Sequence, residues 1–299
     1  MRIVIAGGTG FVGAALTEYM ASQGHNLFIL TRNPATKGTK KNATYVKWLT
    51  GDSNPENELK NIDAVINLAG ESINSRWTKE RKKEIYDSRI ETTERILELI
   101  ERMSKRPSVF INASAIGFYG TSKKKTFTEE WDEAGGDFLA RTVKAWEQTA
   151  SKAAAMGVRT VFARFGLILS DTGGALPKMA LPYRLHAGGK VGSGKQWVSW
   201  IHLRDAIRSI DFILYKEKIS GPVNITAPKP VKMNDFGKKL GEALDRKHWL
   251  PVPGIALRLL LGEMSMLLLS GQKVLPKKLE DAGFTFQFPT LKKALRDLF

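Results

Sequence analysis

The sequence predicts an α/β protein with a Rossmann-like doubly wound parallel sheet and a smaller, mostly helical C-terminal region on the substrate side. Three observations support this prediction. Short apolar runs alternate with helical patterns through the first two-thirds of the 299 residues. A glycine-rich turn follows the first apolar run. After about residue 172, segments rich in Gly and Pro replace the alternation.

The alternating elements can be assigned in chain order. RIVIA (2–6) is an unbroken apolar run, as a buried parallel strand requires. The following helix has Val12, Leu16 and Met20 on one face, and Gly24 is expected to end it. Further strands are expected in NLFILT (26–31), TYVKWL (44–49), DAVINLAG (63–70), PSVFINAS (107–114) and RTVFARFGLIL (159–169), and further helices at about 79–103 and 138–156.

Three regions are expected. They are a dinucleotide-binding domain (1–172, with late elements from 192–228), substrate-side segments (173–247) and a helical appendage (248–299). Asn234 or Asp235 is expected to cap a helix at 236–244. Residues 254–271 approach membrane-spanning length, but Arg258 and Glu263 interrupt them, so we expect buried or groove-lining helices there.

Composition narrows the functional classes. The chain has no cysteine, which excludes disulfides and thiolate chemistry, and its four histidines lack metal-ligand spacing, so no metal is expected. The formal charge is +16, and an anionic partner (a phosphate-rich cofactor, nucleic acid or a membrane surface) is one interpretation. Because the lysines lie in separate clusters, such as TKGTKK (36–41), we favour a solvated basic surface, with no nucleic-acid and no membrane partner. The N-terminus enters a strand without a charged leader, so a cytoplasmic location is expected, and a homodimer stays open.

The strongest motif is the glycine turn in IVIAGGTGFVGAAL (3–16). Gly7 permits a tight turn, Gly10 lets backbone amides approach a pyrophosphate, and Gly13 lets the helix pack close to the sheet. The neighbouring Thr9, Phe11 and Val12 are expected to contact the same cofactor.

Cofactor choice is expected at the end of the second strand, where an acidic residue would bind the ribose of NAD. The sequence there is LTRNP, which has no acid but has Arg32. A guanidinium can pair with a 2′-phosphate, so NADP(H) is favoured over NAD(H), although a plain surface arginine is the alternative. We also expect Leu68, Ala69, Gly70 and Glu71, which follow the fourth strand, and Arg164 near the end of the sixth strand, to contribute to this site.

Four motifs occur in this order along the chain: the glycine motif, DAVINLAG, NASAIGFYG and GSGKQWVSWIHLRDAI. Through these motifs the chain resembles the extended short-chain dehydrogenase/reductase superfamily, which includes nucleotide-sugar epimerases. A second set of stretches comprises SAIGFYG, KAWEQTA, GGALPKM, WIHLRDAI and the tail KVLPKKLEDAGFTFQFPTLKKAL. Through them the chain is similar, over essentially its whole length, to one branch, the bacterial YfhF/YfcH-like epimerase family. The resemblance implies a nicotinamide cofactor, a small-molecule substrate and an active-site serine at Ser114. It also implies a tyrosine acid whose pKa a lysine lowers.

Two departures from the superfamily pattern stand out. The resemblance places the Tyr-x-x-x-Lys pair at Phe138 or Leu139 and at Thr142 or Val143, none of which can transfer a proton. The arginine that grips a sugar-nucleotide diphosphate falls at Val198. Tyr119 and Lys123 in YGTSK have the right spacing, but they lie in a loop, which does not align side chains as one helical turn does.

Ser114 and Tyr119 are therefore the remaining catalytic candidates. Two hypotheses follow. The chain is a divergent NADP(H)-dependent oxidoreductase or epimerase, or it is a catalytically degenerate cofactor-binding regulator or scaffold.

Overall fold

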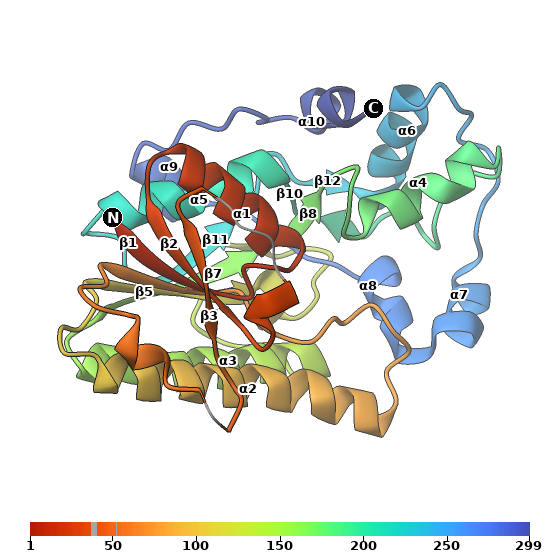
Figure 1. Cartoon of the computed structure of the whole chain (residues 1–299). Coiled ribbons are helices and arrows are strands. Elements are labelled where there is room, and N and C mark those ends of the chain that lie inside the picture. The colour runs from red at the N-terminus through yellow and green to blue at the C-terminus, as the bar shows by residue number, and fades with distance from the viewer. Residues whose placement is uncertain (37–40, 52) are drawn as a thin grey trace.

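The computed structural model describes residues 1–36, 41–51 and 53–299, and its centre is a sheet of seven parallel strands (Figure 1). The strand order is β11-β7-β5-β4-β1-β2-β3, which reverses direction between β1 and β4. The strands of this sheet are β1 (Arg2–Ala6), β2 (Asn26–Thr31), β3 (Ala43–Lys47), β4 (Ala64–Asn67), β5 (Val109–Ala115), β7 (Arg159–Phe165) and β11 (Gly221–Ile225). This is the Rossmann-like fold that the sequence predicts.

Helices cover both faces of the sheet and a further group lies beyond its carboxyl edge. They are α1 (Phe11–Ser22), α2 (Lys79–Arg102), α3 (Phe138–Ala155), α4 (Leu176–Arg184), α5 (Leu203–Tyr215), α6 (Met233–Ala243), α7 (Gly254–Leu261), α8 (Met266–Leu269), α9 (Lys277–Asp281) and α10 (Leu291–Leu298). Short strand pairs join β8 (Leu167–Leu169) to β10 (Trp200–His202), β9 (Trp197–Val198) to β12 (Val231–Lys232) and β6 (Thr126–Phe127) to β13 (Lys273–Val274). The part of the chain that the structure describes also has four 3-10 turns: η1 (Pro34–Thr36), η2 (Pro55–Asn57), η3 (Ile116–Tyr119) and η4 (Gly262–Ser265).

Two apolar layers hold the helices against the sheet. One face packs on α1 and α5, with Leu16 and Ile210 fully buried, and the other packs on α2 and α3, with Ile96 and Ala150 fully buried. Figure 1 shows these two layers above and below the strands. Because both faces are covered, the strands are mostly apolar, which is the pattern that predicted them, with buried polar exceptions such as Asn67, Asn112 and Arg164.

The expected sixth strand, residues 159–169, is wrong as one element. The chain leaves the sheet at Gly166, whose amide donates to the Ile225 carbonyl at 3.1 Å, and β8 then pairs with β10 instead. A Cβ at Gly166 would lie 2.6 Å from the Ser199 carbonyl oxygen, so a side chain there would block this crossing. The long apolar run concealed the break because both of its halves are buried or half-buried.

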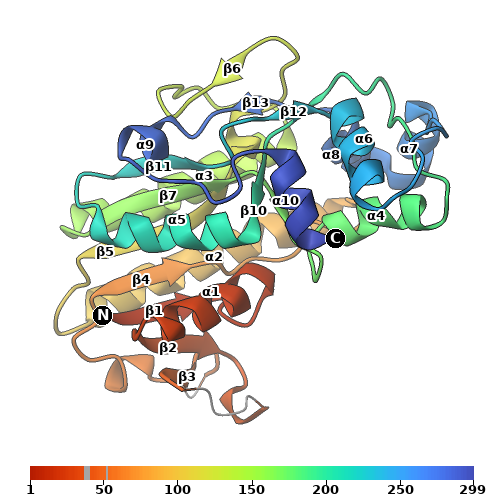
Figure 2. The same ribbon diagram turned by 90° about the horizontal axis from the view of Figure 1, so that it is seen from above.

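A third core joins the segments after residue 172. Leu176, Trp200, Phe236 and Leu295 are buried together, so α4, α6 and α10 form one unit beyond the carboxyl edge (Figure 2). The predicted cap of the helix near 236 is wrong: α6 begins at Met233, no side chain caps it, and Asn234 Oδ1 instead accepts from His248 Nε2 at 3.1 Å.

The buried carboxylate of Asp205 holds the C-terminal segment against α5. It accepts the amides of Gln287 at 2.9 Å and Phe288 at 2.8 Å, and it pairs with Arg208 at 2.8 Å. Phe288 in turn stacks on His202 with ring centroids 3.8 Å apart. Burial lowers the pKa of His202 although Asp297 lies 3.3 Å from its Nε2. The WIHLRDAI motif therefore anchors the C-terminal region.

The expectation that residues 254–271 form buried or groove-lining helices is wrong for α7, which has no buried residue. Ile255, Leu259 and Leu260 are all more than two-thirds exposed. Among the described residues, no helix combines the length and apolar character that crossing a bilayer requires.

Replacing Asp205 by asparagine should weaken the docking of the C-terminal segment. The amide offers one acceptor oxygen where three donors converge, and its own N–H groups would face those donors, so we expect a loss of about 3 kcal/mol in the free energy of unfolding. Urea denaturation of Asp205→Asn measures this loss. Asp281→Asn on α9, whose side chain is 62% exposed, is the matched control and should change stability little.

Candidate cofactor and active site

The glycine turn between β1 and α1 is held by backbone contacts that exclude side chains. Gly7 has a φ of 76°, and a Cβ there would lie 2.7 Å from the Ala69 amide nitrogen. The Gly10 amide donates to the Gly7 carbonyl at 3.0 Å. A Cβ on Gly13 would overlap that same carbonyl oxygen. The three glycines therefore bring α1 against the turn that follows β4, as a dinucleotide cradle requires.

The first turn of α1 is open to an anion. Gly10 is its N-cap and no side chain caps the turn, so the backbone amides near Phe11 and Val12 keep their hydrogen-bonding capacity. Thr9 is exposed beside them. The Phe11 ring lies against Gly173, where a Cβ would be 2.6 Å from it, so the GGALPKM segment packs over the start of the helix. These residues fit the pyrophosphate of a dinucleotide.

Arg32 follows β2 directly, at the sheet edge where the glycine turn also lies. Its side chain is exposed, and none of the hydrogen bonds or ion pairs among the described residues involves it. Most of the TKGTKK cluster, residues 37–40, lies outside the described residues. A guanidinium in this position is available for a phosphate.

A buried polar network shapes the turn NLAG after β4. Asn67 and Asn112 face each other in register across β4 and β5, and their amides are joined at 2.7 Å. Asn67 Oδ1 accepts the Ala69 amide at 3.1 Å, which fixes the turn through Leu68. Thr93 Oγ1 accepts from Asn67 and from Trp146 Nε1 at 2.9 Å, so α2 and α3 share the network. The sequence did not predict this network, although both strands contain the same Ile-Asn pair.

Glu71 lies beyond this turn and is exposed. Its carboxylate pairs with Arg81 at 3.2 Å, and its carbonyl accepts from Arg89 at 3.2 Å. Arg89 packs along Gly70 and over the Trp146 ring, and burial lowers its pKa to about 10. Two arginines thus fix the segment that connects the turn to α2.

Ser114 and Arg164, which are partners in register across β5 and β7, meet at the carboxylate of Glu147 on α3. Arg164 forms two hydrogen bonds of 2.7 Å with Glu147, and Ser114 Oγ donates to Glu147 Oε1 at 2.5 Å. All three side chains are buried. Burial alone would lower the pKa of Arg164, but its hydrogen bonds and charge interaction with Glu147 outweigh this and raise it. The structure therefore brings Ser114 and Arg164 together, with Arg164 bound to Glu147.

Tyr119 is also buried, with 4% of its surface exposed. Its hydroxyl donates to Asn224 Oδ1 at 2.8 Å, and its ring stacks on Phe127 at a centroid distance of 5.1 Å. Burial raises the pKa of its phenol, and the nearby Arg164 charge opposes that shift. The Lys123 side chain is exposed, so the two residues of YGTSK do not form a pair.

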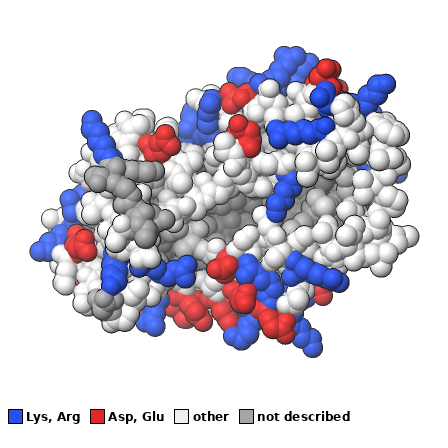
Figure 3. All heavy atoms as spheres, turned by 45° about the vertical axis from the view of Figure 1, so that its right-hand side comes forward, with Lys and Arg blue, Asp and Glu red and all other residues white. Residues whose placement is uncertain are grey.

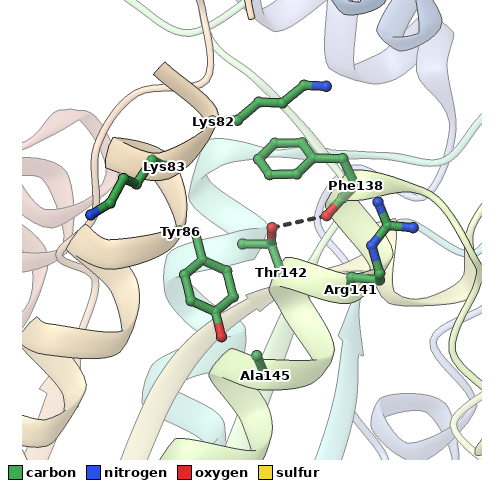
Figure 4. Close-up of a pocket in the computed structure, with 7 residues that line it drawn as sticks. All are labelled: Lys82, Lys83, Tyr86, Phe138, Arg141, Thr142 and Ala145. Carbon is green, nitrogen blue, oxygen red and sulfur yellow. Dashed lines mark hydrogen bonds between the residues drawn. The ribbon is translucent and has the colours of Figure 1, made fainter. Parts of the chain in front are cut away.

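The positions that the superfamily gives to tyrosine and lysine lie in a groove between α2 and α3 (Figure 4). Phe138 packs edge-on against Trp77 and beneath the Lys82 ammonium. Thr142 Oγ1 donates to the Phe138 carbonyl at 2.8 Å, as the dashed line in Figure 4 shows. This part of α3 offers packing and a backbone hydrogen bond.

The C-terminal chain crosses the loop that carries Tyr119. Gln272 Nε2 donates to the Ile116 carbonyl at 2.9 Å, the Ser122 amide donates to the Gly271 carbonyl at 3.0 Å, and Asn224 Nδ2 donates to the Leu275 carbonyl at 2.9 Å. The space-filling view shows a hollow across the face that is turned forward, with Lys and Arg interspersed with Asp and Glu on both of its rims (Figure 3). Among the described residues, no three acidic or histidine side chains gather as a metal site would need.

Two sequence families match this chain. Residues 3–226 match the NAD dependent epimerase/dehydratase family, and residues 252–298 match a domain of unknown function, DUF1731. The chain belongs to the NAD dependent epimerase/dehydratase family. The first match covers the whole seven-stranded sheet except Arg2 at the start of β1, and the second covers α7 to α10.

Members similar over their whole length are known. This epimerase-family chain is 48% identical over 298 residues to the epimerase family protein YfhF of Bacillus subtilis, covering 100% of this chain and 98% of that protein. Among solved structures it is similar to a human epimerase family protein, SDR39U1 isoform 2 with NADPH, with 31% identity, a TM-score of 0.87, and 100% and 99% of the two chains covered. MoeE5 in complex with UDP-glucose and NAD has the same fold, with a TM-score of 0.79, 18% identity, and 100% and 97% covered.

Removing one partner of the Glu147–Arg164 pair should destabilise the protein more than replacing both partners with apolar residues. Glu147→Leu leaves a buried guanidinium unpaired, so we expect a loss of about 3 kcal/mol or more in the free energy of unfolding. The double variant Glu147→Leu with Arg164→Met removes both charges and should recover much of that loss. Denaturant unfolding of the two variants measures the difference, and equal losses would contradict a dominant charge penalty.

Proposed function

We propose that this protein binds NADP(H) in preference to NAD(H) and catalyses hydride transfer on a small-molecule substrate, as a divergent oxidoreductase or epimerase. The observation that carries the proposal is the joint position of the uncapped α1 turn and Arg32 at one sheet edge. The first supplies amides for a pyrophosphate and the second supplies a guanidinium for a 2′-phosphate.

Family membership supports the nicotinamide cofactor, and the human relative with NADPH is in keeping with the phosphate assignment. A carboxylate at this position would bind the ribose hydroxyls and repel a phosphate. The sequence has Arg32, followed by Asn33, and neither is acidic. The preference for the phosphorylated cofactor therefore depends on a single charged side chain.

The chemistry is proposed for residues near the carboxyl ends of β4 and β5. A bound nicotinamide supplies or accepts the hydride. Leu68, Ala69, Gly70 and Glu71 are proposed to border the cofactor. Ser114 is proposed to hold a substrate oxygen and Tyr119 to transfer its proton, which would require each hydroxyl to exchange its present partner, Glu147 or Asn224, for the substrate. Such hydrogen bonds often rearrange when a substrate binds.

Arg164 is proposed to act on Tyr119 electrostatically, through its positive charge. It lies over the Phe118 ring at 3.6 Å and the Tyr119 ring at 4.9 Å. A buried cation stabilises phenolate relative to phenol, in the direction that proton donation by Tyr119 requires.

A second candidate, a cofactor-binding regulator or scaffold without catalysis, is favoured by a specific observation. Both candidate hydroxyls already donate to buried acceptors, and the resemblance places the superfamily's acid at Phe138 or Leu139 and its lysine at Thr142 or Val143 on α3. In this case the nucleotide site would report cofactor binding to a partner.

Removing the Arg32 guanidinium should abolish cofactor discrimination. We expect Arg32→Ala to weaken NADPH binding by about 10- to 100-fold while NADH binding changes little, because only the phosphorylated cofactor gains charge-assisted hydrogen bonds. Isothermal titration with both cofactors measures the ratio. Arg296→Ala, an exposed arginine on α10, is the control, and an unchanged ratio in Arg32→Ala would contradict the assignment.

Two substitutions distinguish the enzyme from the regulator. Carbonyl compounds are first screened for those that support NADPH oxidation. For an enzyme, Ser114→Ala and Tyr119→Phe should each lower kcat/KM at least about 100-fold while NADPH still binds. A wild-type protein that binds NADPH and oxidises it with none of the substrates would favour the regulator. Full activity in Tyr119→Phe would remove Tyr119 from the reaction.

A further inference from the structure

The end of the molecule farthest from β3 carries a row of protruding apolar side chains. Ile255, Leu259 and Leu260 of α7 are 71%, 77% and 74% exposed, and Trp249 just before them is 62% exposed. Leu185, which directly follows α4, is 68% exposed. Exposed apolar groups are common singly, but a cluster of this kind marks a binding surface.

Two contacts join the segments that carry these residues, and we call the surface at this end of the molecule the α4–α7 face. Trp249 Nε1 donates to the His186 carbonyl at 2.9 Å, and Val252 forms a parallel bridge with Val191. The chain before α7 is thus tied to the chain after α4. Figures 1 and 2 both place α4 and α7 at the same end of the molecule.

The two segments that carry this face, residues 172–204 and 246–262, contain no Asp or Glu. They contain eight Lys and Arg residues, all exposed or half-buried, of which Arg204 pairs with Asp297: Lys178, Arg184, Lys190, Lys195, Arg204, Arg246, Lys247 and Arg258. The thirty acidic residues of the chain lie outside these two segments, and the nearest in sequence are Asp171, Asp205, Asp245 and Glu263.

We propose that the α4–α7 face docks on an anionic phospholipid bilayer, in place of the sequence-based expectation that the chain has no membrane partner. Apolar side chains on a short helix, surrounded by cations, are what an interfacial helix presents to a membrane, where the leucines enter the headgroup boundary and the cations face the phosphates. α7 has eight residues, which suits lying in the interface plane.

The same features disfavour a second copy of this chain as the occupant. An isologous contact would bring two positive faces together and leave no acidic residue of these segments to pair with them. A protein partner would need preformed pockets for protruding Leu259 and Leu260, whereas a bilayer accommodates them by deformation. Trp249 adds an indole whose N–H is already bonded, and tryptophan is enriched at bilayer interfaces.

Flotation with lipid vesicles tests the proposal. The full-length protein is mixed with vesicles of phosphatidylglycerol and phosphatidylcholine in equal amounts, or of phosphatidylcholine alone. We expect it to float with the anionic vesicles only. The variant Ile255→Ser, Leu259→Ser, Leu260→Ser should lower the bound fraction at least about tenfold, because the apolar part of the interaction is removed. These side chains are exposed, so the melting temperature should be unchanged.

Tyr215→Ser is the matched control, because Tyr215 is 60% exposed at the far end of α5, and it should float like the wild type. Flotation of the triple variant at the wild-type level would overturn the proposal, since net charge alone would then explain binding. Absence of flotation would overturn it as well. In that case, a dimer that the triple variant converts to a monomer would assign the face to a second copy, and a monomer would assign it to a protein partner.

Discussion

The close approach of the Gly13 backbone to the Gly7 carbonyl constrains the geometry of the candidate cofactor site. It fixes where α1 begins, and the same turn touches the backbone of Leu68 and Ala69 after β4. Two adjacent strands and one helix N-terminus therefore meet at one point, where the strand order of the sheet reverses. In doubly wound folds that is where ligands bind. Arg32 is proposed to bind the 2′-phosphate of the cofactor because β2, which it follows, ends at the same edge of the sheet.

The interior behind the candidate site contains several buried polar side chains. The Asn67–Asn112 pair fixes the cofactor-side turn, while Glu147 gathers Ser114 and Arg164 beneath the next strand ends. These groups bond to neighbours from other elements, which lowers the cost of burying them, and Arg164 Nη1 alone among them has no hydrogen-bond partner within the described residues. Ser114 and Tyr119, whose hydroxyls the proposed proton transfer requires, are hydrogen-bonded to Glu147 and Asn224. The same side chains therefore contribute to stability and to the proposed chemistry.

The C-terminal region is joined to this arrangement from both sides. Asp205 binds its last loop, and Gln272 binds the segment beside Tyr119. Lys82 on α2 pairs with Glu263 of η4, which links the appendage to the opposite rim. Helices α7 and α8 contribute no fully buried residue, so this part is held mainly by its ends and leaves an apolar, positively charged face outside.

The sequence by itself determined the sheet, its covering helices and the glycine turn, because apolar periodicity and the steric demands of glycine act between near neighbours in the chain. The resemblance to the superfamily also predicted that its tyrosine and lysine positions are occupied by other residues here. Only the tertiary structure decided which partner each buried polar side chain has. Arg164 reaches Glu147, Tyr119 reaches Asn224, and the apolar run at 159–169 divides at Gly166. Those outcomes depend on distances between strands and helices far apart in sequence, and no local pattern records them.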